Sequence, residues 1–81
     1  MDKIKELRDK IDKIDEQIFR LFDERFKITA EVGRYKKDKG IEVTHSNREA
    51  DILSKIGKFE FNEEIKELYC ILFEISKRQQ R

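Results

Sequence analysis

The sequence contains no proline and no tryptophan, and only three of its 81 residues are glycine. Proline and glycine are the residues that most strongly disfavour a helix interior, so their scarcity favours long helices. Charged residues make up 46% of the chain and apolar residues 37%. This composition is typical of one small helical domain, and we therefore expect residues 1–81 to form a single all-α domain.

Cysteine and histidine each occur once, as Cys70 and His45. A single cysteine excludes an intramolecular disulfide, and one cysteine with one histidine does not supply the ligands of a zinc site. We predict no metal or other cofactor, and we expect Cys70 to be a small buried side chain. Small domains commonly need a disulfide, a metal or a partner to be stable, so oligomerisation is the remaining route.

Long apolar runs are also absent. No stretch approaches the roughly 20 apolar residues that span a bilayer, and the first residues lack the apolar core of a signal peptide. Lysine and arginine number 19 against 18 aspartates and glutamates, and the two signs are interspersed, with a net charge of +1. Such mixed charge does not favour a nucleic-acid or membrane surface. We expect a soluble, cytoplasmic protein with neither of these partners.

The first half of the chain carries a regular apolar pattern, which we call the seam. Its residues recur at steps that alternate between three and four, at Ile4, Leu7, Ile11, Ile14, Ile18, Leu21, Ile28, Val32 and Tyr35. This spacing predicts an amphipathic helix over about residues 2–39, with Asp2 as its N-cap and Gly40 after its end. Such a helix is about 55 Å long, and two shorter helices cannot cover it. We therefore expect the seam to pack against a second copy of itself in a homodimer.

Two shorter helices are predicted in the second half. Ser46 and Glu49 form a capping-box pattern, which predicts a helix over about residues 46–57. Asn62 is a good N-cap for a third helix over about residues 63–80. The inward face of this third helix would consist of Ile65, Leu68, Leu72 and Ile75. The expected architecture is three helices per chain: long, short and medium.

Arg25 interrupts the seam at a position where the spacing calls for an apolar residue. An uncompensated charge within an apolar interface is costly. One interpretation is that Asp23, Glu24 or a carboxylate of the partner chain neutralises Arg25, or that it only fixes the register. The other interpretation is an anion-binding pocket. The residues alone leave both open.

Lys36 lies about 16 Å beyond Arg25 along the same helix, so the two side chains can grip one small anion between them. Gly33 lies within this helix and would let another segment approach the backbone closely. Arg8 is about 42 Å from Lys36, so a straight helix cannot bring both to one site. An antiparallel partner chain can bring its own Arg8 there. Taken singly, Arg8 and Lys36 are typical of solvated surface residues.

Further polar residues sit at helix ends. Ser76 and Gln80 are four residues apart and share a face of the third helix, and Arg48 and Glu49 open the second helix. Each also has a structural interpretation. Ser76 can bond to a helix carbonyl, Gln80 can belong to a frayed end, and Glu49 can serve the capping box. On the same interpretation, His45 is an ordinary loop residue.

Taken together, these residues resemble the all-helical chorismate mutases, whose three-helix chains form intertwined dimers. The resemblance covers about residues 7–80. Its motifs are Leu7-Arg8-Asp9-Lys10-Ile11-Asp12-Lys13-Ile14-Asp15, Glu24-Arg25, Val32-Gly33-Arg34-Tyr35-Lys36, Arg48-Glu49-Ala50, and Ser76 with Gln80. Their order, spacing and expected helix placement all agree, which makes the set specific.

The resemblance implies a role for each matching position. Arg25 would bind a substrate carboxylate within its own chain, and Arg8 would reach a carboxylate across the dimer. Lys36 would contact a carboxylate and the ether oxygen of the substrate. Gln80 would donate to the same ether oxygen.

The remaining matching positions would complete the pocket. Glu49 would meet the ring hydroxyl of the substrate, and Arg48 and Ser76 would line the pocket and help to bind a carboxylate. One position departs from the family, because His45 stands where aspartate is usual. If the side chain at this position shapes the pocket, hydroxyl recognition or pH dependence would differ.

The implied activity is the rearrangement of chorismate, a small dianion, to prephenate in the phenylalanine and tyrosine branch of aromatic amino acid biosynthesis. This unimolecular reaction needs no nucleophile, metal or proton relay. Catalysis would rest on holding the reactive conformation and on stabilising developing charge, with Lys36, Gln80 and Arg25 as catalytic residues. Two alternatives stay open: an isochorismate-pyruvate lyase on the same scaffold, and a non-enzymatic helical dimerisation or regulatory module. Whether the chain is free-standing or part of a fused enzyme also stays open.

Overall fold

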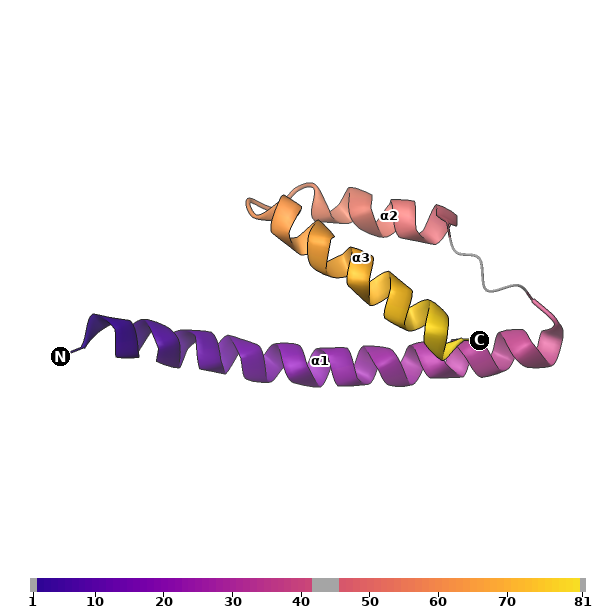
Figure 1. Cartoon of the computed structure of the whole chain (residues 1–81), viewed down its shortest axis with the longest axis horizontal. Coiled ribbons are helices and arrows are strands. Elements are labelled where there is room, and N and C mark those ends of the chain that lie inside the picture. The colour runs from indigo at the N-terminus through magenta and orange to yellow at the C-terminus, as the bar shows by residue number, and fades with distance from the viewer. Residues whose placement is uncertain (1, 42–45, 81) are drawn as a thin grey trace.

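The computed structural model describes residues 2–41 and 46–80 of the chain. These residues form three helices, α1 (Lys3–Lys39), α2 (Ser46–Ile56) and α3 (Asn62–Gln79), and the described part of the chain contains no strand. Figure 1 shows the long α1 with the two shorter helices on one side of it. The predicted all-α class is therefore confirmed. His45 lies outside the described residues.

Both ends of α1 are set by the chemistry that the sequence predicts. The Asp2 carboxylate accepts a hydrogen bond from the backbone N–H of Ile4 at 3.0 Å, which satisfies a donor that the first turn leaves open. At the other end, Gly40 adopts a left-handed conformation with φ 67°, and the next residue, Ile41, donates to the Lys36 carbonyl at 2.8 Å.

The start of α3 differs from the prediction by one residue. Asn62 is the first residue of the helix, and Phe61 occupies the N-cap position without a side-chain hydrogen bond. The Asn62 amide instead donates to the Phe59 carbonyl at 2.9 Å. The predicted N-cap at Asn62 is therefore wrong, because its side chain bonds backward to the turn rather than forward to the helix.

The three helices form an open arrangement. Figure 1 shows that α3 meets α1 at the C-terminal end of α3, that α2 lies beside α3, and that the N-terminal half of α1 extends away from both. The described chain measures 59 × 24 × 15 Å, and its radius of gyration is 16.2 Å. A compact chain of this length would have a radius of gyration of about 12 Å. Half of α1 is thus not packed against its own chain.

The hydrophobic core is small and lies where α3 meets its neighbours. Among the described residues, the buried apolar side chains are Ile56, Leu72 and Phe73. Tyr69 packs edge-on against Phe73, with ring centroids 5.9 Å apart. This small core holds α2 against α3 and packs the C-terminal end of α3 against α1.

Two expectations about burial are wrong for the isolated chain. The sequence places Leu68 on the inward face of α3 and Cys70 in the interior, but both are exposed. The reason is geometric: α3 packs along one line through Tyr69, Leu72 and Phe73, so neither α1 nor α2 covers its other sides.

The seam of α1 is exposed along its whole length. Its nine apolar side chains keep 38–62% of their surface exposed. The solvent-accessible area of the chain is 7073 Å², whereas a compact monomer of this mass would expose about 5,200 Å². Separately, no helix in the described part of the chain combines the length and apolar character needed to cross a membrane.

Candidate active site

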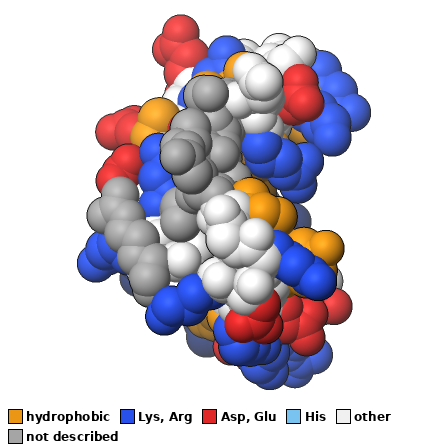
Figure 2. All heavy atoms as spheres, turned by 90° about the vertical axis from the view of Figure 1, so that its right-hand side faces the viewer, with side chains coloured by type: hydrophobic (Ala, Val, Ile, Leu, Met, Phe, Trp, Pro, Cys, Tyr) orange, Lys and Arg blue, Asp and Glu red, His pale blue; other side chains and the backbone are white. Residues whose placement is uncertain are grey.

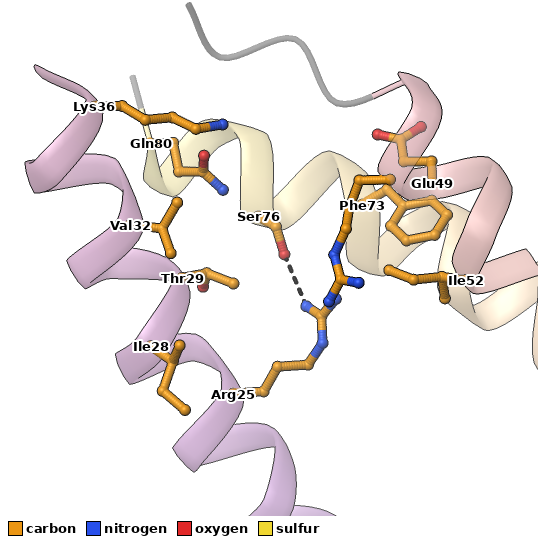
Figure 3. A pocket seen from close by; sticks show the side chains of 11 residues that line it. Arg25, Ile28, Thr29, Val32, Lys36, Glu49, Ile52, Phe73, Ser76 and Gln80 are labelled. Carbon is orange, nitrogen blue, oxygen red and sulfur yellow. Dashed lines mark hydrogen bonds between the residues drawn. The ribbon is translucent and has the colours of Figure 1, made fainter. Parts of the chain in front are cut away.

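All three helices contribute to one pocket of about 490 Å³, shown in Figure 3. This volume is within the range of small-molecule sites. Its lining residues are Arg25, Ile28, Thr29, Val32 and Lys36 from α1, Arg48, Glu49 and Ile52 from α2, and Phe73, Ser76 and Gln80 from the end of α3.

Helix periodicity explains why these residues meet. Arg25, Thr29 and Lys36 are separated by four and seven residues, so they lie on one face of α1. Ser76 and Gln80 are four residues apart on α3 and face the same space. In Figure 3, Lys36 and Gln80 extend into one end of the pocket, while Arg25 reaches toward Ser76 nearer the other end.

Gly33 allows the end of α3 to approach α1 closely. A Cβ at position 33 would lie 2.8 Å from the Cα of Gln80 and 3.1 Å from its Cγ. Gly33 is itself buried, and Gln80 is only 8% exposed. The predicted close approach is therefore confirmed, and Gln80 is packed against α1 rather than exposed at a frayed end.

A polar contact beside Gly33 joins the same two helices. The Thr29 hydroxyl oxygen lies 2.6 Å from Oε1 of Gln79 and 3.1 Å from the Phe26 carbonyl, so its single proton can be donated to either acceptor. Nε2 of Gln79 also donates to the Phe26 carbonyl, at 3.4 Å. These bonds fix the last turn of α3, which carries Gln80, on α1.

Arg25 is half-buried, and its described contacts are with neutral groups. Its guanidinium donates to the Ser76 hydroxyl at 3.1 Å and lies 5.8 Å from the centroid of the Tyr69 ring. Asp23, one predicted neutralising residue, pairs with Lys27 at 3.1 Å instead. Within residues 2–41 and 46–80, no carboxylate forms an ion pair with Arg25, so its charge can serve an anionic ligand.

Glu49 forms an ion pair that joins α2 to α3. Nζ of Lys77 lies 3.1 Å from its carboxylate, and the two side chains are only 27% and 23% exposed. This hydrogen bond raises the pKa of Lys77 above its usual value of 10.5. Glu49 is the acidic residue among the lining residues, and Lys77 offsets its charge.

The pocket brings together most of the predicted site residues, namely Arg25, Lys36, Arg48, Glu49, Ser76 and Gln80. Arg8 is exposed and lies about 26 Å from Arg25 along α1, far from this pocket in its own chain.

Two residues of this region were not predicted to have a role. Thr29 lines the pocket four residues after Arg25, and this helical spacing was the available signal. Lys77 follows Ser76 directly, but it pairs with Glu49 on another helix, and no pattern among neighbouring residues in the sequence predicts this pair.

The charges of the lining suit a small dianion. The cationic side chains Arg25, Lys36 and Arg48 lie around the pocket, and its acidic residue is paired. Figure 2 shows the nearby end of the molecule, where basic and acidic side chains are intermixed with exposed hydrophobic ones. Charges of both signs are therefore mixed on this face.

Comparison with known proteins agrees with this geometry. The family model described as chorismate mutase type II matches residues 7–81. The bifunctional chorismate mutase/prephenate dehydratase of Aquifex aeolicus (strain VF5) is 41% identical over 56 residues, which cover 69% of this chain and 16% of that protein. The search of solved structures found no match. Because the family match extends over nearly the whole chain, the chain belongs to the chorismate mutase type II family.

Proposed function

We propose that this pocket converts chorismate to prephenate in aromatic amino acid biosynthesis. The observation that carries the proposal is the half-buried guanidinium of Arg25, which faces the pocket with a hydroxyl and an aromatic ring as its described neighbours. A charge in such a place is stabilised by an anionic ligand. Lys36 supplies a second cation in the same pocket, as a substrate with two carboxylates requires.

The proposed chemistry rearranges one molecule. The ether C–O bond of chorismate breaks while a new C–C bond forms between its side chain and its ring, and no group leaves. Arg25 would bind a carboxylate and hold the side chain folded over the ring. Lys36 and Gln80 would donate hydrogen bonds to the ether oxygen, which gains negative charge as its bond to carbon breaks. Both side chains line the same pocket and extend toward one end of it in Figure 3, which supports this assignment.

The other lining residues would bind and orient the substrate. Glu49 would accept a hydrogen bond from the ring hydroxyl, while Arg48 and Ser76 would help to bind a carboxylate. Ser76 would act through Arg25, since its hydroxyl accepts the hydrogen bond that orients the guanidinium. His45 remains a predicted neighbour of the site.

The proposal includes a homodimer in which Arg8 reaches the partner's pocket. The exposed seam supports it, because the chain exposes about 1,900 Å² more than a compact monomer would, which is enough for an extensive obligate interface. The seam residues have the same spacing when read from either end. An antiparallel partner chain can therefore place its own Val32 opposite Leu7 and its own Ile28 opposite Ile11. This register would bring Arg8 beside the partner's Val32, which lines the pocket.

The first test measures chorismate consumption and prephenate formation by the wild-type protein and by Arg25→Met. Removing Arg25 should lower kcat/KM by about 10²- to 10³-fold while the helical content is retained. The matched control is Arg20→Met, because Arg20 lies on the same helix in an exposed pair with Glu16. Equal activity of Arg25→Met and wild type would refute the assignment. Salicylate and pyruvate formed from isochorismate would indicate the lyase instead.

The second test uses mixed dimers. Arg8→Ala and Arg25→Ala proteins are each expected to be nearly inactive, but a dimer with one subunit of each has one pocket with both arginines. Random pairing should restore about one quarter of the wild-type pockets. If Arg8 served its own chain, mixing would restore no activity. A different affinity tag on each variant allows the mixed dimer to be isolated and shows that the chains have paired.

A further inference from the structure

Glu49 poses an electrostatic problem for a pocket that binds a dianion. Glu49 lines the same space as Arg25 and Lys36. At about 6 Å and an effective dielectric constant of about 20, a bare carboxylate would weaken the binding of each like charge by about a hundredfold. An acidic residue is therefore compatible with this pocket only if a cation compensates it.

Lys77 is the cation that meets this requirement. Its ammonium lies 3.1 Å from the Glu49 carboxylate, and both side chains are largely shielded from water. Glu74 also lies within 3.7 Å of the ammonium, but its side chain is 71% exposed. Shielding strengthens the first pair relative to the second, because water and salt screen exposed charges.

The position of Lys77 also connects it to the catalytic end of α3. Lys77 lies directly after Ser76. The Lys77 carbonyl accepts a hydrogen bond from the backbone N–H of Gln80 at 3.1 Å. The ion pair with Glu49 therefore joins the start of α2 to the turn that presents Gln80. Figure 3 shows Glu49 on α2 and Ser76 on α3, and both line the pocket.

We propose that Lys77 is a positioning residue of this site, which holds the Glu49 carboxylate as an acceptor for the substrate's hydroxyl and neutralises its repulsion of the substrate's carboxylates. The inference rests on the proposed function, because it assigns Glu49 to hydroxyl recognition. Lys77 itself does not line the pocket and acts through Glu49. Lys77 therefore affects substrate affinity more than the rate at which the bound substrate reacts.

The test compares Lys77→Met with Lys77→Arg under steady-state conditions with chorismate. Lys77→Met should raise KM by about ten- to a hundredfold and change kcat much less, because the uncompensated carboxylate repels the substrate before and during reaction. Lys77→Arg keeps the charge and should largely restore KM. The matched control is Lys66→Met, which removes the same charge from α3 about 16 Å away and should leave both constants unchanged.

A double variant separates positioning from direct substrate contact. In a Glu49→Gln background there is no carboxylate to compensate, so adding Lys77→Met should have little further effect on KM. If the effects of the two substitutions on KM multiply fully, Lys77 contacts the substrate itself and the proposal is overturned. An unchanged KM in Lys77→Met alone would overturn it as well.

A readout without substrate keeps the inference separate from the proposed function. In the wild type, NMR titration of the Lys77 ammonium should give a pKa above the usual value, and in Glu49→Gln this pKa should fall, because the hydrogen bond to Glu49 is the main cause of the rise. An unchanged pKa would mean that the pair does not form and would refute the inference. Absence of wild-type turnover would count against the proposed function instead.

Discussion

Replacing Gly33 with alanine tests how Gln80 reaches the pocket. The new Cβ would lie 2.8 Å from the Cα of Gln80, whereas ordinary contacts begin at 3.4 Å. The end of α3 must therefore move by about 0.6 Å or more, since backbone atoms cannot rotate out of the way as a side chain can. Gln80 is carried by the backbone that must move.

The expected cost falls on activity more than on stability. A displacement of about 1 Å in a catalytic donor can cost about a hundredfold in rate, so Gly33→Ala should lower kcat by roughly ten- to a hundredfold. Overpacking costs about 1–3 kcal/mol, and alanine in a helix interior regains about 0.5–1 kcal/mol relative to glycine. The net loss of about 1 kcal/mol would lower Tm by about 4–8 °C.

The assay combines the rate of chorismate consumption with thermal unfolding followed by circular dichroism. Gly57→Ala is the matched control, because the Cβ built at Gly57 meets only the Ser54 carbonyl at 3.4 Å, which is an ordinary contact. The effect should also disappear in a Gln80→Ala background, where no donor is left to misplace. Wild-type activity in Gly33→Ala together with a raised Tm would refute the reasoning.

Three further outcomes are expected. Thr29→Val should cost about 1 kcal/mol in urea unfolding and accelerate hydrogen exchange in the last turn of α3, because the bond to Gln79 is lost; unchanged exchange would contradict this. In a Cys70→Ser background, Leu7→Cys combined with Val32→Cys should form a disulfide between chains, whereas Leu7→Cys with Ile14→Cys should not, since only the first pair faces in the antiparallel register. The pair of Lys77 with Glu49 raises the pKa of Lys77, so its stabilisation is fully present below pH 10.5 and is lost as pH rises through the higher folded-state pKa. The Tm difference between wild type and Lys77→Met should thus stay constant from neutral pH up to mildly alkaline pH and vanish only in strong alkali.

The helices were predictable because their signals are local. Periodic apolar residues, the Asp2 cap and the left-handed Gly40 each act within a few residues of one another, so α1 has nearly the expected bounds. The error at Asn62 arose where two local bonds compete, one forward to the helix and one backward to Phe59. Which bond forms depends on the path of the turn, and no local pattern in the sequence determines that path.

The site was predictable in part. Arg25 stands out because a charge in an apolar seam is costly, and Gly33 stands out because glycine destabilises a helix interior. Lys36, Glu49 and Gln80 indicate a substrate site only when they are taken together with their spacing, and the family resemblance supplied that pattern. Thr29 and Lys77 were not assigned roles, because their partners lie on other helices and no spacing rule connects them.

The seam and the pocket share part of their surface, and this links association to ligand binding. Ile28 and Val32 belong to the seam and line the pocket, yet they are 54% and 38% exposed in the single chain. A partner that covers the seam would also close this side of the pocket and bring its Arg8 to the ligand. Since the ligand would then bind the dimer more tightly than the monomer, its presence must tighten the dimer by the same factor. A dianionic ligand should therefore lower the dimer dissociation constant, and should lose this effect in Arg8→Ala, where the partner's contribution to the pocket is removed.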